Sequence, residues 1–507
     1  MNYSEVFGKV VSHCKEYGFI FPSGEIYDGL SAVYDYGPAG VQLKRNLSGA
    51  WWKAMTQKFD NIVGLDAAIL MPPTVWKASG HVDAFNDPLI DNKDSKKRYR
   101  ADVLVEDFIE KLLEKARKEE EKLVKKGKSP EEAARMPQVK KSVEKAEEAR
   151  TRLAEVVNAG DMAAFKQLIE DLEIACPESG TRNWTDVRQF NLMFKTRLGA
   201  VAEEGSDLYL RPETAQGIFV NFLNVQKSSR MKVPFGVAQI GKAFRNEIVA
   251  RQFIFRMREF EQMEMQYFVR PGTQSEHYAF WKEERMRWHL SLGIPAERLR
   301  YKDHDKLAHY ADAATDIEFF YPFGWKETEG IHSRTDYDLR RHQEFSGKKQ
   351  SYFDPETQES YLPYVIETSV GLDRTVLMHL CNAYAEEEAP TAEGGTEIRT
   401  VLRFHPSVAP TYVAVLPLVK KDGLAEAAQA LHERLKDRFF CAYDEKDAVG
   451  RRYRRQDAKG TPFCVTLDYD TASDGAVTVR ERDSMRQERI SIDALEAYLS
   501  EKLAGGR

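Results

Sequence analysis

Cysteine is scarce in this chain: 5 of its 507 residues are cysteines, and they stand far apart at positions 14, 176, 381, 441 and 464. An odd number of widely spaced cysteines excludes a disulfide scaffold. Proteins built without disulfides are typical of reducing compartments, and we therefore expect this protein in the cytoplasm.

Long apolar runs are also absent. No stretch approaches the roughly 20 apolar residues that a membrane-spanning helix needs, so we expect no membrane partner. The first residues, MNYSE, lack the basic and then apolar order of a secretory signal. Hydrophobic residues make up 42% of the chain and charged residues 30%, which are proportions of a globular protein and exclude disorder throughout.

Neither sign of charge dominates. Lys and Arg number 74 and Asp and Glu number 80, which gives a net charge of −6. A mildly acidic total argues against non-specific coating of DNA, while a local basic patch can still bind a nucleic acid. The length of 507 residues predicts about three domains.

Residues 110–155 form a zone dominated by Lys, Glu, Arg and Ala, which favours helix. Gly127 is placed to end one helix. Ser129 is placed to cap the next, with Pro130 at its first position and Glu132 completing a capping box. The zone therefore predicts a charged helical hairpin, which is either a solvated surface feature or an arm that contacts a partner molecule.

The last hundred residues predict a separate mixed α/β domain. Its helix is marked by Leu424, Ala428, Leu431 and Leu435, which share one face. The segment 405–410 contains two prolines and is predicted to be a linker. Strands are predicted near 411–418, 440–443, 463–469, 476–480 and 489–492.

Residues 236–269 predict a long antiparallel hairpin, because both halves alternate with the period of a strand. In the second half, Met263 and Met265 fall on an apolar face. The opposite face carries Phe260, Gln262, Glu264 and Gln266. A solvated sheet face usually shows Lys, Thr and Ser, so a face lined by Glu, Gln and Phe favours a ligand site.

Residues 361–384 predict a strand followed directly by a helix. Glu367 and Ser369 lie on one face of the strand, and Gly371 lets the chain turn. Arg374 then falls in the first helical turn, where it and free backbone amides suit an anion, or where it forms a surface salt bridge. The segment 33–55 predicts a turn at Pro38 and a helix whose apolar side holds Val41, Leu43, Leu47 and Trp51.

These three segments resemble the signature motifs of class II aminoacyl-tRNA synthetases, and more narrowly those of glycyl-tRNA synthetases of the homodimeric type. The helix after Pro38 resembles motif 1, FRNE at 244–247 resembles motif 2, and GLDR at 371–374 resembles motif 3. Further matches are RPETAQG at 211–217, FEQME at 260–264, GWKE at 324–327 and ETSVG at 367–371. The resemblance covers nearly the whole chain apart from the charged hairpin.

The resemblance implies an α+β fold. A class II synthetase-like antiparallel sheet with flanking helices is expected to carry a charged helical insertion and a C-terminal mixed α/β anticodon-binding domain. The expected bounds are 1–105 for the first part of the catalytic domain with motif 1, 106–180 for the insertion, 181–405 for the second part with motifs 2 and 3, and 406–507 for the anticodon-binding domain. Motif 1 implies a homodimer.

The resemblance also implies a two-step reaction. Glycine and ATP give glycyl-adenylate and pyrophosphate, and the glycyl group then passes to the 3′ end of tRNA(Gly). Fixed cations are the main catalytic device in such phosphate chemistry. Arg245 is expected at the α-phosphate, and Arg374 at the γ-phosphate and over the adenine ring.

The expected ATP site extends along motifs 2 and 3. Phe260 is expected to form the other side of the adenine sandwich, and Glu247 to accept from the adenine amino group. Mg²⁺ is expected between the phosphates, with Glu327 and Glu367 as candidate ligands. The full set of expected ATP-binding residues is Arg245, Asn246, Glu247, Phe255, Arg256, Met257, Arg258, Glu259, Phe260, Glu327, Thr328, Gly371, Leu372, Asp373 and Arg374.

The glycine site implied by the resemblance surrounds an ammonium group with carboxylates. Arg100 is expected at the substrate carboxylate, unless it only belongs to the basic run 96–100. A cluster of carboxylates fits a bound cation and would otherwise repel itself. The full set of expected glycine-binding residues is Arg100, Glu213, Phe260, Glu261, Gln262, Met263, Glu264, Glu367, Thr368, Ser369, Val370 and Gly371.

The sequence departs from the family in its insertion. Many relatives carry two Cys-x-x-Cys pairs there, an arrangement that binds zinc. Here the first pair is replaced by Asn92 and Ser95, and the second by Cys176 and Ser179. A four-thiolate site is excluded, and we expect no zinc.

The expected tRNA contact of the C-terminal domain is the window 451–460, which holds five cations and one anion. Arginines beside Tyr453 suit phosphates and unstacked bases, although a helix face that simply needs charge explains the same pattern. The expected tRNA-binding residues are Arg451, Arg452, Arg454 and Arg455, and the charged hairpin is a second candidate for contact with tRNA.

Two other functions compete with the synthetase. A non-catalytic class II paralogue that binds nucleic acid, or acts as an accessory protein, would have lost catalytic residues. A third possibility keeps the adenylate chemistry but uses another acceptor, or makes dinucleotide polyphosphates. The paralogue is disfavoured because the sequence retains Arg245, Glu247, Glu264, Glu367, Ser369 and Arg374.

Overall fold

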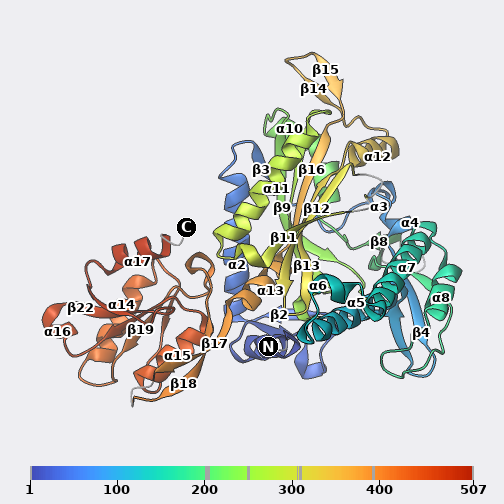
Figure 1. The fold of residues 1–507 in the computed structure, drawn as a ribbon. Coiled ribbons are helices and arrows are strands. Elements are labelled where there is room, and N and C mark those ends of the chain that lie inside the picture. Colours follow the sequence, from blue (N-terminus) through green and yellow to red (C-terminus); the bar gives the residue numbers. More distant parts are fainter. Residues whose placement is uncertain are drawn as a thin grey trace. The chain divides into compact units, whose positions relative to one another are not determined.

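The computed structural model describes residues 3–199, 206–247, 252–304, 307, 311–390 and 394–504. The chain divides into two compact units (Figure 1). The larger, here called the core unit, comprises Met1–Ser79, Thr196–Phe244 and Gln252–Arg507. The smaller, here called the insertion unit, comprises Gly80–Lys195 and Arg245–Arg251.

A seven-stranded sheet organises the described part of the core unit. All neighbouring strands are antiparallel except β3, which runs parallel to β9. The sheet contains the predicted hairpin as β9 and β10, and the predicted strand at the third motif as β16. In order across the sheet the strands are β11 (Leu299–Asp303), β12 (Ala313–Tyr321), β13 (Gly324–Ser333), β16 (Tyr364–Gly371), β10 (Glu259–Val269), β9 (Phe235–Phe244) and β3 (Ile62–Gly64).

The two faces of this sheet differ as the alternation predicted. Met263 and Met265 of β10 are fully buried in a hydrophobic core shared with the helices α2 (Pro38–Thr56), α11 (Gln274–Ser291) and α13 (Leu372–Ala383). On the other face Glu264 lies opposite Gln239 of β9 and Ser369 of β16. One sheet face is thus packed, and the other carries the polar side chains of the motifs.

The predicted helix after Pro38 is confirmed as α2, with the proline in its first turn. Leu43, Leu47 and Trp51 are fully buried, as expected from their spacing. Val41 was predicted on the same side but is 39% exposed. Two residues along a helix differ by about 200°, so Val41 and Leu43 cannot share a face.

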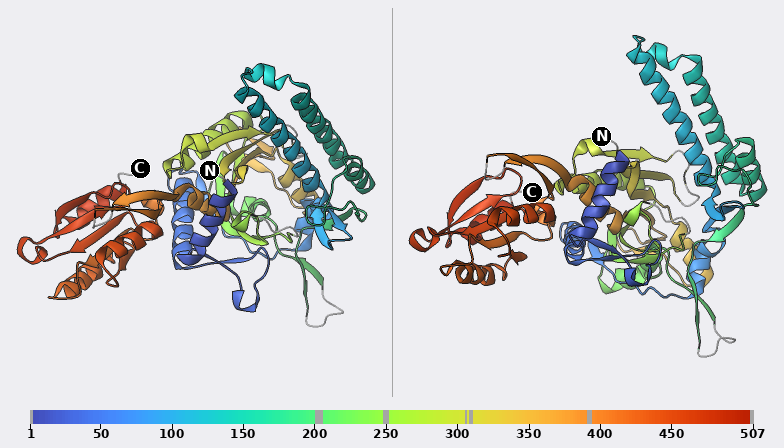
Figure 2. Two further views of the ribbon diagram at one scale, coloured as in Figure 1. Left: turned by 60° about the horizontal axis from the view of Figure 1, so that its bottom comes forward. Right: turned by 90° about the horizontal axis from the view of Figure 1, so that it is seen from below.

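The insertion unit contains the predicted charged hairpin. Its long helices α5 (Ala101–Lys125) and α7 (Pro137–Ala159) pack side by side (Figure 2). Between them α6 (Pro130–Ala134) begins with the predicted capping box: Ser129 accepts from the backbone of Glu132, whose side chain accepts from the backbone of Ser129. The α8 helix (Met162–Asp171) packs against both long helices.

The insertion unit extends beyond the charged zone 110–155 that composition marks out, and beyond the bounds 106–180 expected for the insertion. The unit also contains a three-stranded sheet of β4 (Asn86–Asn92), β5 (Lys97–Arg100) and β6 (Arg188–Asn191), and α5 contacts two of these strands, β4 and β5. The β5 strand is basic, but composition does not show that the three strands form one sheet, and only their pairing reveals that they belong to the insertion unit.

The C-terminal part forms the expected mixed sheet. The strands β20 (Cys441–Tyr443), β19 (Val413–Pro417) and β21 (Phe463–Leu467) are parallel, and β22 (Ala476–Glu481) and β23 (Gln487–Ser491) extend the sheet antiparallel. The helices α14 (Leu424–Leu435) and α17 (Leu495–Ala504) bury Leu431, Leu435 and Leu499 in one cluster with it. The expected linker contains a short 3-10 helix, Pro406–Val408, and Val408 is fully buried.

All five cysteines are free. Within the described residues, no helix combines the length and the apolar character that crossing a membrane requires.

Candidate active site

Two buried glutamates stand at the centre of the polar face of the core sheet. Glu264 of β10 is 2% exposed and Glu367 of β16 is 4% exposed. Gln266 lies between them, and its Nε2 donates to Glu264 Oε1 at 2.9 Å and to Glu367 Oε2 at 2.8 Å. Thr214 donates a further hydrogen bond to Glu264. Strand register produces this arrangement, because Gln266 and Glu367 are paired residues of β10 and β16.

The two glutamates have opposite pKa shifts. Burial, together with the negative charges of Glu367 and Glu213, raises the pKa of Glu264 well above its ordinary value. Burial acts in the same direction on Glu367. However, the charge of Arg334 and the hydrogen bond from His332 outweigh burial and hold the pKa of Glu367 below its ordinary value. Of the two glutamates, Glu264 is therefore the one that holds a proton more readily.

Glu367 is held by groups that the sequence did not single out. Arg334 Nη1 donates to Glu367 Oε2 at 2.9 Å, and His332 Nδ1 lies 2.8 Å from Glu367 Oε1. Arg334 also donates from Nε to Asp338 at 2.9 Å. The pKa of His332 is raised, because Glu367 outweighs the lowering effect of burial. Both residues lie at or beside the end of β13, and only the pairing of β13 with β16 brings them to Glu367.

Glu213, the third expected ammonium ligand, enters from the segment before α9 (Ala215–Val220). Gln216 Nε2 donates to Glu213 Oε1 at 2.9 Å and to Asp338 Oδ1 at 3.0 Å. His342 Nε2 lies 2.8 Å from Gln216 Oε1 and fixes the orientation of the amide. This network ties Glu213 to the same acidic cluster as Glu264 and Glu367.

Arg374 stands at the start of α13, as predicted, and its guanidinium lies over the ring of Phe255 at 4.3 Å from the centroid. Its Nε donates to the backbone oxygen of Phe255 at 3.2 Å, and its Nη1 lies 3.2 Å from Glu327 Oε2. Glu327 is half exposed. The arginine is thus held flat on an aromatic ring, with a carboxylate at its edge.

Asp373 and Glu261 are joined by Lys44 of α2. Lys44 Nζ lies 2.6 Å from Glu261 Oε2 and 2.9 Å from Asp373 Oδ1. Tyr36 also donates to Asp373, and the backbone N–H of Glu261 donates to it at 2.7 Å. These bonds link the three motif segments to one another. Lys44 was not singled out from the sequence.

The other expected site residues of the core unit differ in their contacts and in their exposure. Gln262 Nε2 donates to Ser369 Oγ at 3.4 Å, and Gly371 is paired with Gln262. Glu259 forms an ion pair with Lys242, and Arg258 Nη1 donates to the backbone oxygen of Ser31 at 3.1 Å. Phe260 and Arg256 are intermediate in exposure. The buried members are Met257, Met263, Thr328, Thr368, Val370 and Leu372.

The insertion unit contains the remaining expected residues. The Arg245 guanidinium lies over the Phe85 ring at 5.4 Å, and the backbone N–H of Asn246 donates to Leu192 at 2.7 Å. Glu247 is 8% exposed and lies near Arg100. Arg100 forms ion pairs with Asp87 at 3.0 Å and with Asp102 at 2.7 Å. Burial lowers the pKa of Arg100, but Asp102 and Asp87 outweigh it and raise that pKa overall. Residues 248–251, which follow motif 2 in the chain and include Arg251, lie outside the described residues.

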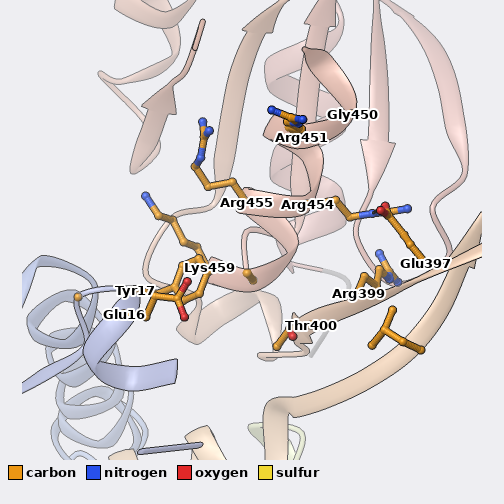
Figure 3. A pocket seen from close by; sticks show the side chains of 13 residues that line it. Glu16, Tyr17, Glu397, Arg399, Thr400, Gly450, Arg451, Arg454, Arg455 and Lys459 are labelled. Carbon is orange, nitrogen blue, oxygen red and sulfur yellow. Dashed lines mark hydrogen bonds and ion pairs between the residues drawn. The ribbon is translucent and has the colours of Figure 1, made fainter. Parts of the chain in front are cut away.

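The basic C-terminal window forms α15 (Val449–Lys459) and borders a cavity of about 850 Å³. Figure 3 shows this cavity, with Glu16 and Tyr17 of the N-terminal segment across from the helix. Arg454 lies 2.8 Å from Glu397, and Arg455 lies 2.6 Å from Asp447.

Arg452 differs from its neighbours on α15. It is 2% exposed, and its guanidinium donates to the backbone oxygens of Leu418 at 3.1 Å and Asp444 at 3.2 Å. Its side chain therefore satisfies backbone oxygens inside the domain. Arg451 is exposed and forms no ion pair within the described residues, so the two arginines differ in what they can offer a ligand.

The four positions at which the resemblance implies zinc-binding cysteines lie together in the insertion unit. Ser179 Oγ donates to Asn92 Oδ1 at 3.0 Å, and Ser95 Oγ lies 3.4 Å from Cys176 Sγ. Burial would raise the pKa of Cys176, but hydrogen bonds from Ser179, Ser95 and Tyr99 lower it to about 6. A hydrogen-bonded network therefore joins the two turns here.

Because these side chains are already in contact, the combined variant N92C, S95C and S179C is expected to bind one zinc ion more per chain than the wild type. Four thiolates at these positions form a structural zinc site. Elemental analysis after gel filtration measures the zinc content. The control adds Cys176→Ser to the same variant and removes one of the four thiolates. Equal zinc content in the variant and this control would show that the four positions do not converge on an ion.

Three parts of the chain match models of known protein families. Residues 194–383 match the tRNA synthetase class II core domain (G, H, P, S and T), residues 412–502 the anticodon binding domain, and residues 87–192 the glycyl-tRNA synthetase insertion domain 1. Together with the antiparallel sheet, these matches define a class II aminoacyl-tRNA synthetase.

Relatives narrow the family. The glycine–tRNA ligase of Chlorobaculum tepidum is 53% identical over 500 residues, which cover 98% of this chain and 99% of the relative. The glycine–tRNA ligase of Staphylococcus haemolyticus is 49% identical over 497 residues, 98% of each chain. That of Staphylococcus aureus is 49% identical over 495 residues, 97% of this chain and 98% of the relative. The chain belongs to the glycine–tRNA ligase family.

Proposed function

We propose that this chain activates glycine with ATP to give glycyl-adenylate and pyrophosphate, and then transfers glycine to the 3′ end of tRNA(Gly). The observation that carries this proposal is the buried pair Glu264 and Glu367 beside Glu213, on the sheet face that also carries Ser369. Such a carboxylate cluster attracts a small cation, and the ammonium group is the only charged group of glycine that it can bind.

In the first step, the glycine carboxylate attacks the α-phosphorus of ATP and pyrophosphate leaves. The carboxylate is already ionised, so no protein base is needed. Fixed cations stabilise the charge that grows on the phosphate oxygens. We assign Arg374 to the γ-phosphate and adenine, Arg245 to the α-phosphate, and Arg256 and Arg258 to the outgoing pyrophosphate.

Mg²⁺ is part of this proposal, since a divalent cation would neutralise charge on the phosphates of ATP. Glu327 fits as a ligand, because its carboxylate is half exposed and stands at the edge of Arg374. Glu367 does not fit, because His332, Arg334 and Gln266 already occupy both of its oxygens. We therefore assign Glu327 alone to the ion.

Glycine has no side chain to grip, so the site must select it by holding the ammonium and excluding any β-carbon. We assign Glu213, Glu264 and Glu367 to the ammonium, Ser369 to a further hydrogen bond, and Arg100 to the substrate carboxylate. One added methyl group normally changes binding by only about 1–3 kcal/mol, so the pocket wall must be rigid. The hydrogen bonds that fix Gln266 and Gln216 supply that rigidity.

For tRNA binding we assign Arg451, Arg454 and Arg455 on α15. Arg451 is exposed, and all three arginines line the cavity beside α15. Arg452 is left out of this surface, because it is buried and bonded to backbone oxygens. The free cysteines fit a reducing compartment, and we place the protein in the cytoplasm.

A homodimer is the proposed assembly, and the segment before α2 is its proposed contact. Ile26 and Tyr27 of the short 3-10 helix Glu25–Tyr27 are 87% and 83% exposed, and Leu30 is 59% exposed. The double variant Ile26→Asp and Tyr27→Asp is expected to be monomeric in analytical ultracentrifugation, because charges replace apolar contact area. Phe353→Asp, at a 53% exposed site on β14 (Tyr352–Asp354), is the matched control and should stay dimeric. A dimeric double variant would contradict this contact.

The experiment that tests the proposed function is ATP–pyrophosphate exchange without tRNA, with glycine, alanine and serine compared side by side. Exchange with glycine alone is expected. Exchange with all three amino acids would contradict the pocket assignment. No exchange from folded protein with Mg²⁺ would instead favour a non-catalytic paralogue.

A further inference from the structure

Two histidines and an aspartate meet at the edge of the core sheet, next to the acidic cluster but outside the proposed active site. His304 follows β11, Asp316 lies in β12 and His332 lies in β13, three neighbouring strands. One ligand atom from each lies within 4.8 Å of the others, and His304 Nε2 is 2.9 Å from Asp316 Oδ2. Among the described residues this is the only such group of three His, Cys, Asp or Glu.

The orientation of His332 provides a second observation. Its Nδ1 bonds Glu367 at 2.8 Å, and Arg334 fixes Glu367 in turn at 2.9 Å. The other ring nitrogen is therefore left for the group formed by His304 and Asp316. A histidine that ligates a metal almost always bonds a carboxylate or carbonyl through its second nitrogen, which fixes the ring and raises its basicity.

We propose that His304, Asp316 and His332 bind one divalent transition-metal ion of the zinc class. The expectation of no zinc rested on the replaced cysteines of the insertion, and this group lies elsewhere in the chain. Two imidazoles and one carboxylate favour such an ion over Mg²⁺, which prefers oxygen ligands. The three side chains are 34%, 14% and 21% exposed, so an ion can enter from solvent. Three protein ligands leave a coordination position for water.

Gly330 leaves room for this arrangement. It is paired with Asp316 across β12 and β13. A Cβ atom at this position would lie 2.9 Å from His332 Cε1 and 3.7 Å from Asp316 Oδ1. Any larger residue would displace the His332 ring from the ion.

A consequence for the glycine site rests on the proposed function. Glu367 holds His332 and is also assigned to the glycine ammonium. An ion bound to His332 places positive charge beside the ammonium position. It therefore competes with the ammonium for the negative charge of Glu367. Zinc is therefore expected to raise KM for glycine.

The test of the metal site uses the full chain without substrates. Titration with Co²⁺ is expected to give the visible absorption of a low-symmetry site at one ion per chain, and Zn²⁺ should displace it. His304→Ala and Asp316→Asn are each expected to weaken Zn²⁺ binding at least about tenfold, and Glu367→Gln about 10–100-fold through the orientation of His332. His432→Ala, a histidine of α14 outside the group, is the matched control and should bind as the wild type does. Equal affinity in the wild type and His304→Ala, or no saturable binding, would overturn the proposal.

A second measurement separates the site from its consequence. In glycine-dependent exchange, Zn²⁺ should raise KM for glycine in the wild type and have no such effect in His304→Ala. Equal inhibition of both proteins would overturn the coupling to Glu367. The cobalt spectrum needs no substrate, so it remains decisive for the metal site even if the protein fails to activate glycine.

Discussion

Arg374→Ala is expected to lower kcat/KM for glycine-dependent ATP–pyrophosphate exchange by about 10²–10³-fold, the usual cost of removing one fixed donor from a charged transition state. Arg374 is held in place before ATP arrives, with its guanidinium 4.3 Å from the Phe255 ring centroid and its Nε bonded to the Phe255 backbone. The variant should keep its fold, because the side chain lies at the surface of the sheet and is 25% exposed. KM for glycine should change little.

Arg300→Ala is the matched control for this experiment. Arg300 also stacks on an aromatic ring, that of Trp325 at 4.4 Å, and also bonds a glutamate, Glu318 at 2.7 Å. It lies outside the proposed ATP site, so exchange should stay near the wild-type rate. Arg374→Lys should fall between the wild type and Arg374→Ala, because lysine keeps the charge but loses the flat guanidinium. Exchange within a few fold of wild type in folded Arg374→Ala would contradict the assignment.

The parts of the site that depend on local pattern could be predicted from the sequence. Strand periodicity places Glu264 and Gln266 on one face, and the turn at Gly371 places Arg374 at a helix start. His332 and Arg334 could not be predicted in this way. They lie 35 and 33 residues from Glu367 along the chain, and only the pairing of β13 with β16 brings them together.

The basic window on α15 contains a spacing pattern that its charge alone does not reveal. Arg452 and Gln456 are four residues apart, lie on one helix face and are both 2% exposed. Counting charges alone groups Arg452 with Arg451 and Arg454. Helical spacing separates the buried arginine from the exposed ones. The bounds of the insertion unit had no such signal, because the composition of β4, β5 and β6 does not reveal that these strands pair.

Glu264→Gln is expected to abolish measurable selection of glycine while leaving the fold as stable as the wild type or more so. The pKa of Glu264 is raised by burial and by Glu367 and Glu213, so in the empty site Glu264 holds a proton more readily than an ordinary glutamate does. Glutamine has nearly the shape of the protonated form. The ammonium of glycine needs the ionised form, which glutamine cannot provide. Exchange kinetics should therefore show a loss of about 10²-fold or more in kcat/KM for glycine, since the charged partner of a buried ion is removed.

The pH dependence follows from the same shift. Folded Glu264 holds its proton more tightly than the unfolded chain does, so its contribution to stability is complete below the ordinary glutamate pKa. That contribution is lost as pH rises through the raised pKa of the folded state. In thermal unfolding, the Tm of the Glu264→Gln variant should consequently rise relative to the Tm of the wild type as pH rises. Glycine binding has the opposite pH dependence, because it needs the ionised form of Glu264. Wild-type kcat/KM for glycine should therefore increase with pH over the same range.

Glu329→Gln is the contrasting substitution, because Glu329 is as deeply buried in the same sheet but ionised. Burial alone would raise its pKa, but Arg285 and His289 outweigh burial and lower it. Arg285 Nε lies 2.5 Å from Glu329 Oε1, and His289 Nε2 lies 2.8 Å from Oε2. Breaking this buried pair should cost about 3–5 kcal/mol of stability. A similar loss of stability in Glu264→Gln would show that Glu264 is ionised and structurally paired in the empty site, and the assignment of its proton would fail.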